Sequence, residues 1–250
     1  MWEFSLNLTS ADLATRILTS LKCAISQIGG VVTSHSEGEG YSVLVAVKNA
    51  RREEMERILS RQITQIICTH YKTSFLDKNL CLPSHDKMGV IAFKKALLNF
   101  DRETDYYIIQ NNLTFDKDLY LESFYQFKLK SLKAKWSELV SLANENRDYL
   151  ISAEAFNDLL KFLVDNLEIC EDNVDIIEEN NGYKIYSTDK QYQNLVLDEE
   201  GLICSIIDLS PQKITMYCSG VNSTSRFLEN LFDQRIVVKT PKTCASFKKN

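Results

Sequence analysis

The spacing of apolar residues over the first thirty positions places the strongest constraint on what this chain can fold into. Phe4, Leu6 and Leu8 alternate with other residues, which predicts a strand over residues 3–8. Between residues 14 and 28 the apolar spacing changes to three and four, which is typical of a helix with one buried face. Gly29 and Gly30 follow and predict the end of that helix, because glycine adopts the left-handed conformation at little cost. Such a change of period predicts an α+β fold.

The pattern continues in the same way to residue 67. Two strands are expected over residues 31–35 and 41–48, joined by a turn at residues 38–40. Asn49 then caps a second helix, whose apolar stripe begins at Met55. The resulting order is β-α-β-β-α, which is compatible with a split βαβ unit. We therefore expect an N-terminal α+β unit over residues 1–104.

Residues 105–250 predict a second region. Before it, a helix is expected from Ser84 to about residue 100, and residues 106–110 are interpreted as extended. The heptad-like pattern of residues 119–146 and a helix that begins after Ser152 predict a central antiparallel helix pair. A C-terminal β-hairpin and a mixed αβ segment complete the fold. Their expected elements are strands 175–177 and 183–186, residues 202–209 (helix or strand), strand 213–218, helix 224–232 and strand 235–239.

Charge is distributed unevenly along a chain whose formal net charge is −5. Residues 151–205 hold 3 basic and 13 acidic side chains, whereas residues 206–250 hold 7 basic and 3 acidic ones. The overall acidity argues against a general nucleic-acid binder, which needs a basic face. We see no secretory signal pattern, and no apolar run approaches the roughly 20 residues of a membrane helix. We therefore expect a cytoplasmic protein without a membrane partner.

Cysteine and histidine spacing gives one candidate metal site. Cys68, His70, Cys81 and His85 lie within 18 residues of one another. Tetrahedral zinc takes such ligands, but residues two apart on a helix point to different faces. The chain has seven cysteines and no CxxC pair, which favours buried thiols in a reducing cytosol. We therefore expect no metal ligands and no cofactor.

One loop has the composition of a weak anion site. Residues 219–225 (SGVNSTS) join an expected strand to an expected helix. The backbone and hydroxyl groups of Gly220, Ser223 and Thr224 could bind a phosphate, which the helix dipole would favour. The loop lacks both the P-loop and the dinucleotide-binding patterns. The alternative is an ordinary turn in which Ser223 or Thr224 caps the helix.

A run of lysines beside aromatic residues suggests a second site. Lys128, Lys130, Lys133 and Lys135 lie near Phe124, Phe127 and Trp136 in the sequence. At 100° per residue these lysines fall on two different sides of a helix, whereas the aromatics fit its buried side. The alternative to nucleic-acid contact is therefore a solvated helix with an apolar seam. No arrangement of residues along the chain indicates a catalytic nucleophile or base, so catalytic residues are predicted to be none.

Several segments between about residues 106 and 244 match one family pattern. They are residues 120–130 (YLESFYQFKLK), 156–165 (FNDLLKFLVD), 174–177 (VDII), 183–186 (YKIY), 202–214 (LICSIIDLSPQKI) and 227–237 (FLENLFDQRIV), followed by Cys244. In these segments the chain resembles the YtxC-like family, sporulation proteins of endospore-forming Firmicutes. The resemblance implies a sporulation-associated cytoplasmic protein, and a helix over residues 202–209 that ends at Pro211.

The family provides no reaction, cofactor or catalytic residue that could be transferred to this chain. Its members tend to end in a small cluster of cysteines and to have an aliphatic strand that ends in histidine. Here Cys244 alone remains of the first feature, and residues 214–218 read ITMYC in place of the second. A Cys/His metal site is therefore not expected in this protein.

Together these features predict a non-enzymatic accessory protein of sporulation that acts through protein–protein contacts with an unidentified partner. The alternative is a phosphate- or nucleotide-binding enzyme that uses the loop 219–225. A weaker alternative is a nucleic-acid-binding protein that uses residues 128–135 and the basic tail.

Overall fold

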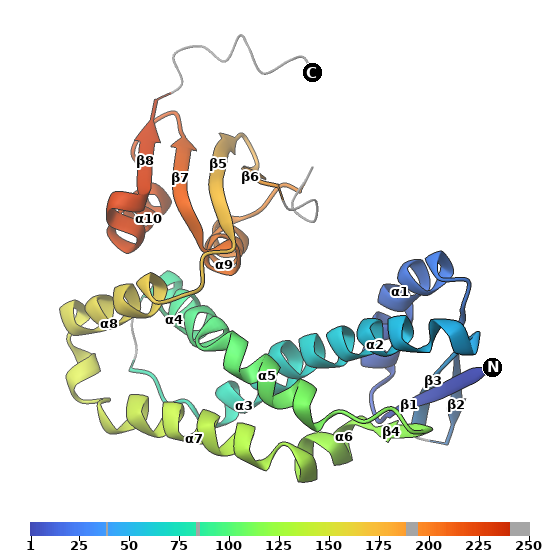
Figure 1. Cartoon of the computed structure of the whole chain (residues 1–250). Helices are drawn as coiled ribbons and strands as arrows, with labels where there is room; N and C mark the ends of the chain where they lie inside the picture. Colours follow the sequence, from blue (N-terminus) through green and yellow to red (C-terminus); the bar gives the residue numbers. More distant parts are fainter. Residues whose placement is uncertain (39, 84–85, 189–194, 241–250) are drawn as a thin grey trace, which may run out of the picture. The chain divides into compact units, whose positions relative to one another are not determined.

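The structure is a computed structural model that describes residues 1–38, 40–83, 86–188 and 195–240. The chain forms two compact units, each built from two separate stretches (Figure 1). Unit 1 comprises Met1–Leu80 and Arg102–Leu142, and unit 2 comprises Cys81–Asp101 and Ala143–Asn250. The boundary expected between residues 104 and 105 therefore falls inside a helix of unit 1, Arg102–Asn112.

Unit 1 is a four-stranded sheet covered by helices on one face. Its elements are β1 (Trp2–Leu8), α1 (Ala11–Gln27), β2 (Val31–Glu37), β3 (Gly40–Val47), η1 (Asn49–Arg51), α2 (Arg52–Ile66), η2 (Ile67–Tyr71), α3 (Lys72–Asn79), α5 (Arg102–Asn112), β4 (Asp118–Tyr120), α6 (Leu121–Ser123), η3 (Phe124–Lys128) and most of α7 (Lys130–Glu145). The sheet order is β2-β3-β1-β4. Strands β1 and β2 both run antiparallel to β3 between them, and β4 runs parallel to β1. This arrangement confirms the split βαβ unit.

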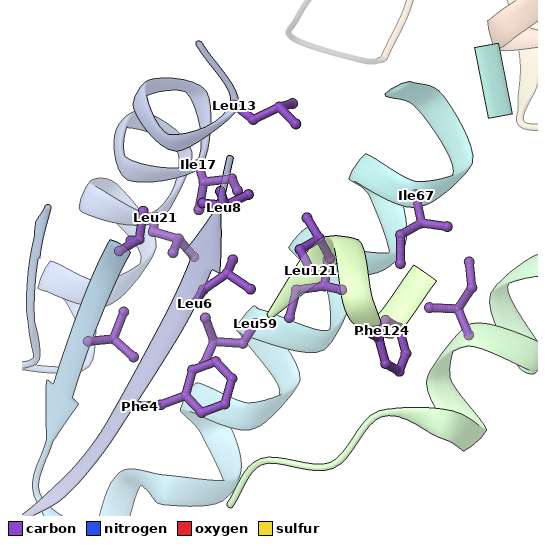
Figure 2. Packing of buried hydrophobic residues seen from close by; sticks show 14 of the residues in the cluster. Phe4, Leu6, Leu8, Leu13, Ile17, Leu21, Leu59, Ile67, Leu121 and Phe124 are labelled. Carbon is purple, nitrogen blue, oxygen red and sulfur yellow. The ribbon is translucent and has the colours of Figure 1, made fainter. Parts of the chain in front are cut away.

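The apolar periodicity explains the core of unit 1. Alternate residues of β1 and β3 point to the covered face, where they meet the buried stripes of α1 and α2. Figure 2 shows Leu6 and Leu8 of β1 gathered with Ile17 and Leu21 of α1. Just after α1, Gly30 allows the backbone to approach Val47 of β3 closely. A Cβ at this position would lie 2.5 Å from Cγ1 of Val47.

Unit 2 is a second four-stranded sheet with helices packed around it. Its elements are α4 (Lys87–Asn99), η4 (Tyr149–Ile151), α8 (Ala153–Asp165), β5 (Glu171–Glu179), β6 (Gly182–Tyr186), α9 (Glu199–Leu209), β7 (Pro211–Tyr217), α10 (Ser223–Phe232), η6 (Asp233–Arg235) and β8 (Ile236–Lys239). The sheet order is β6-β5-β7-β8. Strands β5 and β6 form the expected hairpin, and β5, β7 and β8 run parallel. The C-terminal hairpin and mixed αβ segment are thus confirmed.

Three local expectations are corrected by the structure. Residues 106–110 are helical within α5, because Asp105 and Ile109 are both buried four residues apart. Residues 119–146 do not form one helix, since β4, α6 and the π-helical turn η3 precede α7. The helix pair expected from these residues is divided: α7 up to residue 142 belongs to unit 1, whereas α8 packs on α4 and α10 in unit 2.

One further element settles what the sequence left open. Residues 202–209 are helical, within α9, and Asp198 caps this helix by accepting from the backbone N–H of Gly201. Helix α4 begins after Asp86, and the earlier start expected at Ser84 lies outside the described residues. Among the helices that the structure describes, none has the length and apolar character required to span a membrane.

Candidate functional site

The loop 219–225 forms the cap of α10. Asn222 is the N-cap, and its side chain accepts from the backbone N–H of Ser225 at 2.7 Å. The Ser225 hydroxyl in turn accepts from the backbone N–H of Asn222 at 3.0 Å, which completes a capping box. The cap predicted at Ser223 or Thr224 is therefore wrong by one or two residues.

A carboxylate of the chain itself occupies the donors of this loop. Glu178 Oε2 accepts from the backbone N–H and the hydroxyl of Ser219, at 2.8 and 3.0 Å. Glu178 Oε1 accepts from Asn222 Nδ2 at 2.9 Å. A carboxylate at a helix N-terminus is favoured for the same reason as a phosphate, namely the partial positive charge there. Glu178 therefore provides a negative charge beside this loop and accepts from Ser219 and Asn222.

The three predicted phosphate-binding residues lie in different environments within this loop. Thr224 is buried, and its hydroxyl donates to Glu199 Oε1 at 2.7 Å. Ser223 is exposed, and Gly220 borders open space. Phosphate binding by Gly220, Ser223 and Thr224 stays a prediction, while the observed hydrogen bonds give the loop a capping role.

The structure describes three of the four residues of the candidate zinc site, Cys68, His70 and Cys81. Cys68 is buried in η2 and His70 is exposed, whereas Cys81 belongs to unit 2. His85 and Cys244 lie outside the described residues. Among the residues that the structure describes, no group of three or more His, Cys, Asp or Glu side chains is placed to hold a metal ion.

The lysine run of residues 128–135 does not form a continuous basic face. Lys133 Nζ donates to the backbone and side-chain oxygens of Gln126, and Lys135 Nζ donates to Asp105. Phe124 and Trp136 are buried as expected of an apolar seam, but Phe127 is 70% exposed. Two of the four cations therefore have partners within unit 1.

Asp105 is the centre of a buried polar cluster in unit 1. Its Oδ2 accepts from Lys72 Nζ at 2.7 Å and from Trp136 Nε1 at 3.1 Å. Its Oδ1 accepts from Lys135 Nζ at 2.9 Å. Burial lowers the pKa of Lys72, and the negative charge of Asp105 opposes that shift. Burial also raises the pKa of the Cys68 thiol to about 12, so that the thiol stays protonated beside this cluster.

This cluster holds helices together and offers little to a ligand. Both oxygens of Asp105 are used, and Asp105 and Lys72 are each 1% exposed. The donors come from α3 and α7, while the acceptor comes from α5. An arrangement of this kind is costly to break, because a lone charge would remain in the interior.

A cavity of about 450 Å³ in unit 1 is the candidate small-molecule site. Two π-helical turns border it: η2 contributes His70 and Tyr71, and η3 contributes Tyr125 and Gln126. Such turns are rare and occur frequently at functional sites. The rings of Tyr71 and Tyr125 meet at 4.5 Å between centroids, so the two turns contact each other directly.

Glu122 supplies the carboxylate of this cavity. Its Oε1 accepts from the backbone N–H and the hydroxyl of Thr9, at 3.3 and 2.9 Å. The same oxygen accepts from the Tyr71 hydroxyl at 3.1 Å. Burial and the charge of Glu122 raise the pKa of Tyr71, which keeps the phenol a hydrogen-bond donor. Among the described residues, the hydrogen bonds to Glu122 all go to Oε1.

Comparisons with known proteins identify no relative. No family model, no curated protein and no solved structure matches this chain.

Sequence reasoning missed both Asp105 and Glu122. Asp105 was missed because residues 106–110 of its helix were interpreted as extended, so the helical spacing of Asp105 and the buried Ile109 was not considered. Glu122 gave no signal of its own, because its donors Thr9 and Tyr71 lie 113 and 51 residues away.

Proposed function

We propose that the chain is a cytoplasmic, non-enzymatic accessory protein of sporulation that acts by binding another protein. The resemblance to the YtxC-like family supports the biological setting. The observation that supports protein binding is the open face of the sheet in unit 1. This face is called the outer face below, and it consists of the side chains of β1–β4 that point away from α1.

The strand register defines the outer face. Val31, Ala46 and Glu3 lie in one row across β2, β3 and β1, and Thr33, Leu44 and Ser5 lie in the next. Val31 is 67% exposed and Leu44 is 40% exposed. A depression of about 760 Å³ covers these two rows. Apolar side chains that remain in water at the middle of a sheet favour a partner that covers them.

Charge at the rim of the outer face indicates the chemistry of the partner. Glu3, Asp116 and Asp118 line the depression together with a single lysine, Lys117. The partner that fits this arrangement presents an apolar segment flanked by Lys or Arg. Opposite charges at a rim speed association and make it sensitive to salt.

Strand β2 offers a second means of contact. It lies at the edge of the sheet and pairs with β3 on one side. An edge strand exposes backbone N–H and C=O groups, which an extended segment of another protein can pair with. The partner can therefore combine backbone pairing along β2 with burial of Leu44.

Affinity capture from sporulating cells tests the proposal. The wild-type chain is used as bait at low salt beside Leu44→Lys, which places a charge at the centre of the outer face. The matched control is Phe162→Lys, which changes a side chain that is 57% exposed on α8 of unit 2. We expect the wild type and the control to recover the same specific protein, and Leu44→Lys to lose it.

Two results would contradict the proposal. One is capture of the same protein by Leu44→Lys and by the wild type in equal amount. The other is the absence of any specific protein at low salt. Thermal unfolding of both variants first establishes that neither substitution has altered the fold.

A further inference from the structure

The cavity between η2 and η3 carries opposite charges that are not paired with each other. Glu122 supplies the negative charge, and Lys78 and Lys133 supply positive charges among the residues that line the cavity. Among the ion pairs of the described residues, none includes these three side chains. Residues that line one small cavity and keep separate charges are suited to a ligand that carries both signs.

The negative side is prepared to bind a cation. Three hydrogen bonds fix Glu122 Oε1, from Thr9 and Tyr71. The other oxygen, Oε2, accepts no hydrogen bond from the residues that the structure describes. The side chain is half-buried and lines the cavity, and the hydrogen bonds to Oε1 restrict the rotation of the carboxylate. An ammonium group is the matching ligand for a carboxylate held in this way.

The positive side is prepared to bind an anion. Lys133 Nζ donates to Gln126 O and Oε1 at 2.9 and 3.0 Å, and lies 5.3 Å from the centre of the Tyr125 ring. These contacts position the ammonium without neutralising it. Lys78 is exposed at the cavity, and the N-terminus of α1, capped by Ser10, adds a partial positive charge.

Aromatic and aliphatic side chains complete the wall. Tyr71, Phe75 and Tyr125 line the cavity together with Leu13. A volume of about 450 Å³ lies within the range of small-molecule sites, roughly 300–1,000 Å³. A ligand with an apolar or planar body therefore has both space and contacts.

We propose that this cavity binds a small zwitterion of the α-amino-acid class. Its ammonium group contacts Glu122, its carboxylate lies on the side of Lys133 and Lys78, and its side chain packs on Tyr71 and Phe75. A simple anion fits less well, because Glu122 repels it. A simple cation meets two lysines, and a metal ion finds one carboxylate where it needs several oxygen ligands.

The π-helical turns give this proposal independent support. A π-turn gives up regular i→i+4 hydrogen bonds, and two of the π-turns among the described residues border this same cavity. They place Tyr71 beside Glu122 and leave the Gln126 carbonyl available to Lys133. The site is separate from the outer face, and its ligand does not depend on the protein partner proposed above.

Thermal shift of the full chain with each of the twenty amino acids at 5 mM is the first experiment. We expect at least one of them to raise the unfolding temperature, because a ligand that binds the native state stabilises it. The amide of that amino acid, which lacks the carboxylate, and its deamino acid, which lacks the ammonium group, are the matched probes. Neither is expected to raise the unfolding temperature at the same concentration.

Isothermal titration of variants locates the site. Glu122→Gln keeps an oxygen acceptor for Thr9 and Tyr71 but removes the charge, and is expected to weaken binding at least about tenfold, as for a lost charged hydrogen bond. Lys133→Met removes a positive charge from the cavity, and its affinity can be measured even if Glu122→Gln does not fold. Glu138→Gln, an exposed residue of α7 outside the cavity, is expected to bind like the wild type.

Three results overturn the proposal. The first is the absence of a shift with all twenty amino acids. The second is equal stabilisation by the deamino acid or the amide, which shows that one charge suffices. The third is unchanged affinity in both Glu122→Gln and Lys133→Met.

Discussion

Replacing Asp105 by asparagine removes the only negative charge from the buried cluster of Lys72, Lys135 and Trp136, as far as the described residues show. The asparagine side chain has the same size, so the packing volume is kept. Its amide group presents one oxygen and two donors, whereas the native carboxylate accepts three hydrogen bonds. Lys72, 1% exposed, then loses the negative charge that Asp105 supplies to it.

The expected loss in the free energy of unfolding follows from the negative charge that Lys72 loses. Breaking a buried ion pair on one side costs about 3–5 kcal/mol, whereas domains are stable by roughly 5–15 kcal/mol in total. We therefore expect Asp105→Asn to lose about 3–5 kcal/mol in the free energy of unfolding, measured with urea at pH 7. Glu138→Gln, an exposed acid of the same unit, is the control and is expected to change it by less than about 0.5 kcal/mol.

A second substitution and the pH dependence identify the mechanism. Asp105→Leu combined with Lys72→Met removes both charges of the buried pair and is expected to recover part of the loss, because apolar residues replace a buried pair at little cost. The recovery is incomplete because Trp136 Nε1 loses its acceptor in this variant as well. In Asp105→Asn the pKa of Lys72 falls further below its ordinary value. The unfolded variant then binds more protons than the folded variant does. Its deficit in unfolding free energy relative to the wild type therefore shrinks as the pH rises from 7 to 10. A loss below about 1 kcal/mol, or a deficit independent of pH, would show that Asp105 does not hold a buried charge on Lys72.

Three further predictions concern single residues. The pKa of Cys68 is raised to about 12, so its stabilising contribution is complete below pH 9 and is lost as the pH rises toward 12. Cys68→Ala should therefore flatten the fall in unfolding free energy above pH 9 by up to about 1.4 kcal/mol per pH unit; an unchanged slope would contradict this. Asn222→Ala removes the cap of α10 and should cost about 1 kcal/mol in urea unfolding; no loss would show that the capping box is dispensable. Gly30→Ala forces a methyl group against Val47 and should cost about 1–3 kcal/mol; a neutral result in thermal unfolding would mean that the contact relaxes freely.

The sequence predicted the β-α-β-β-α part of unit 1 well because each element has one buried face with an unbroken period. Leu6 and Leu8 in β1, like Ile17 and Leu21 in α1, occupy the positions that simple alternation or helical spacing requires. The same reasoning failed at residues 119–146. Tyr125 and Leu129 are both buried and keep an apparent helical spacing, although η3 interrupts the helix between them. Apolar spacing does not report a change from α- to π-helical hydrogen bonding.

The candidate cavity and the division into units depend on contacts between distant residues. Lys72 and Asp105 are 33 positions apart, and Thr9 and Glu122 are 113 apart. Such pairs leave no mark on local periodicity. The loop 219–225 shows the opposite case, because its composition suggests an anion site whereas Glu178, 41 residues earlier than Ser219, supplies the anion. Local patterns therefore predicted the elements but not their polar partners.

Photo-crosslinking in sporulating cells tests protein binding through the outer face most directly. A benzophenone amino acid replaces Leu44 in one variant and Phe162 in the other, since both side chains are exposed on different units. We expect one discrete adduct from position 44 that weakens as salt is raised in a lysate, and no matching adduct from position 162. No adduct at position 44, or the same adducts from both positions, would contradict it.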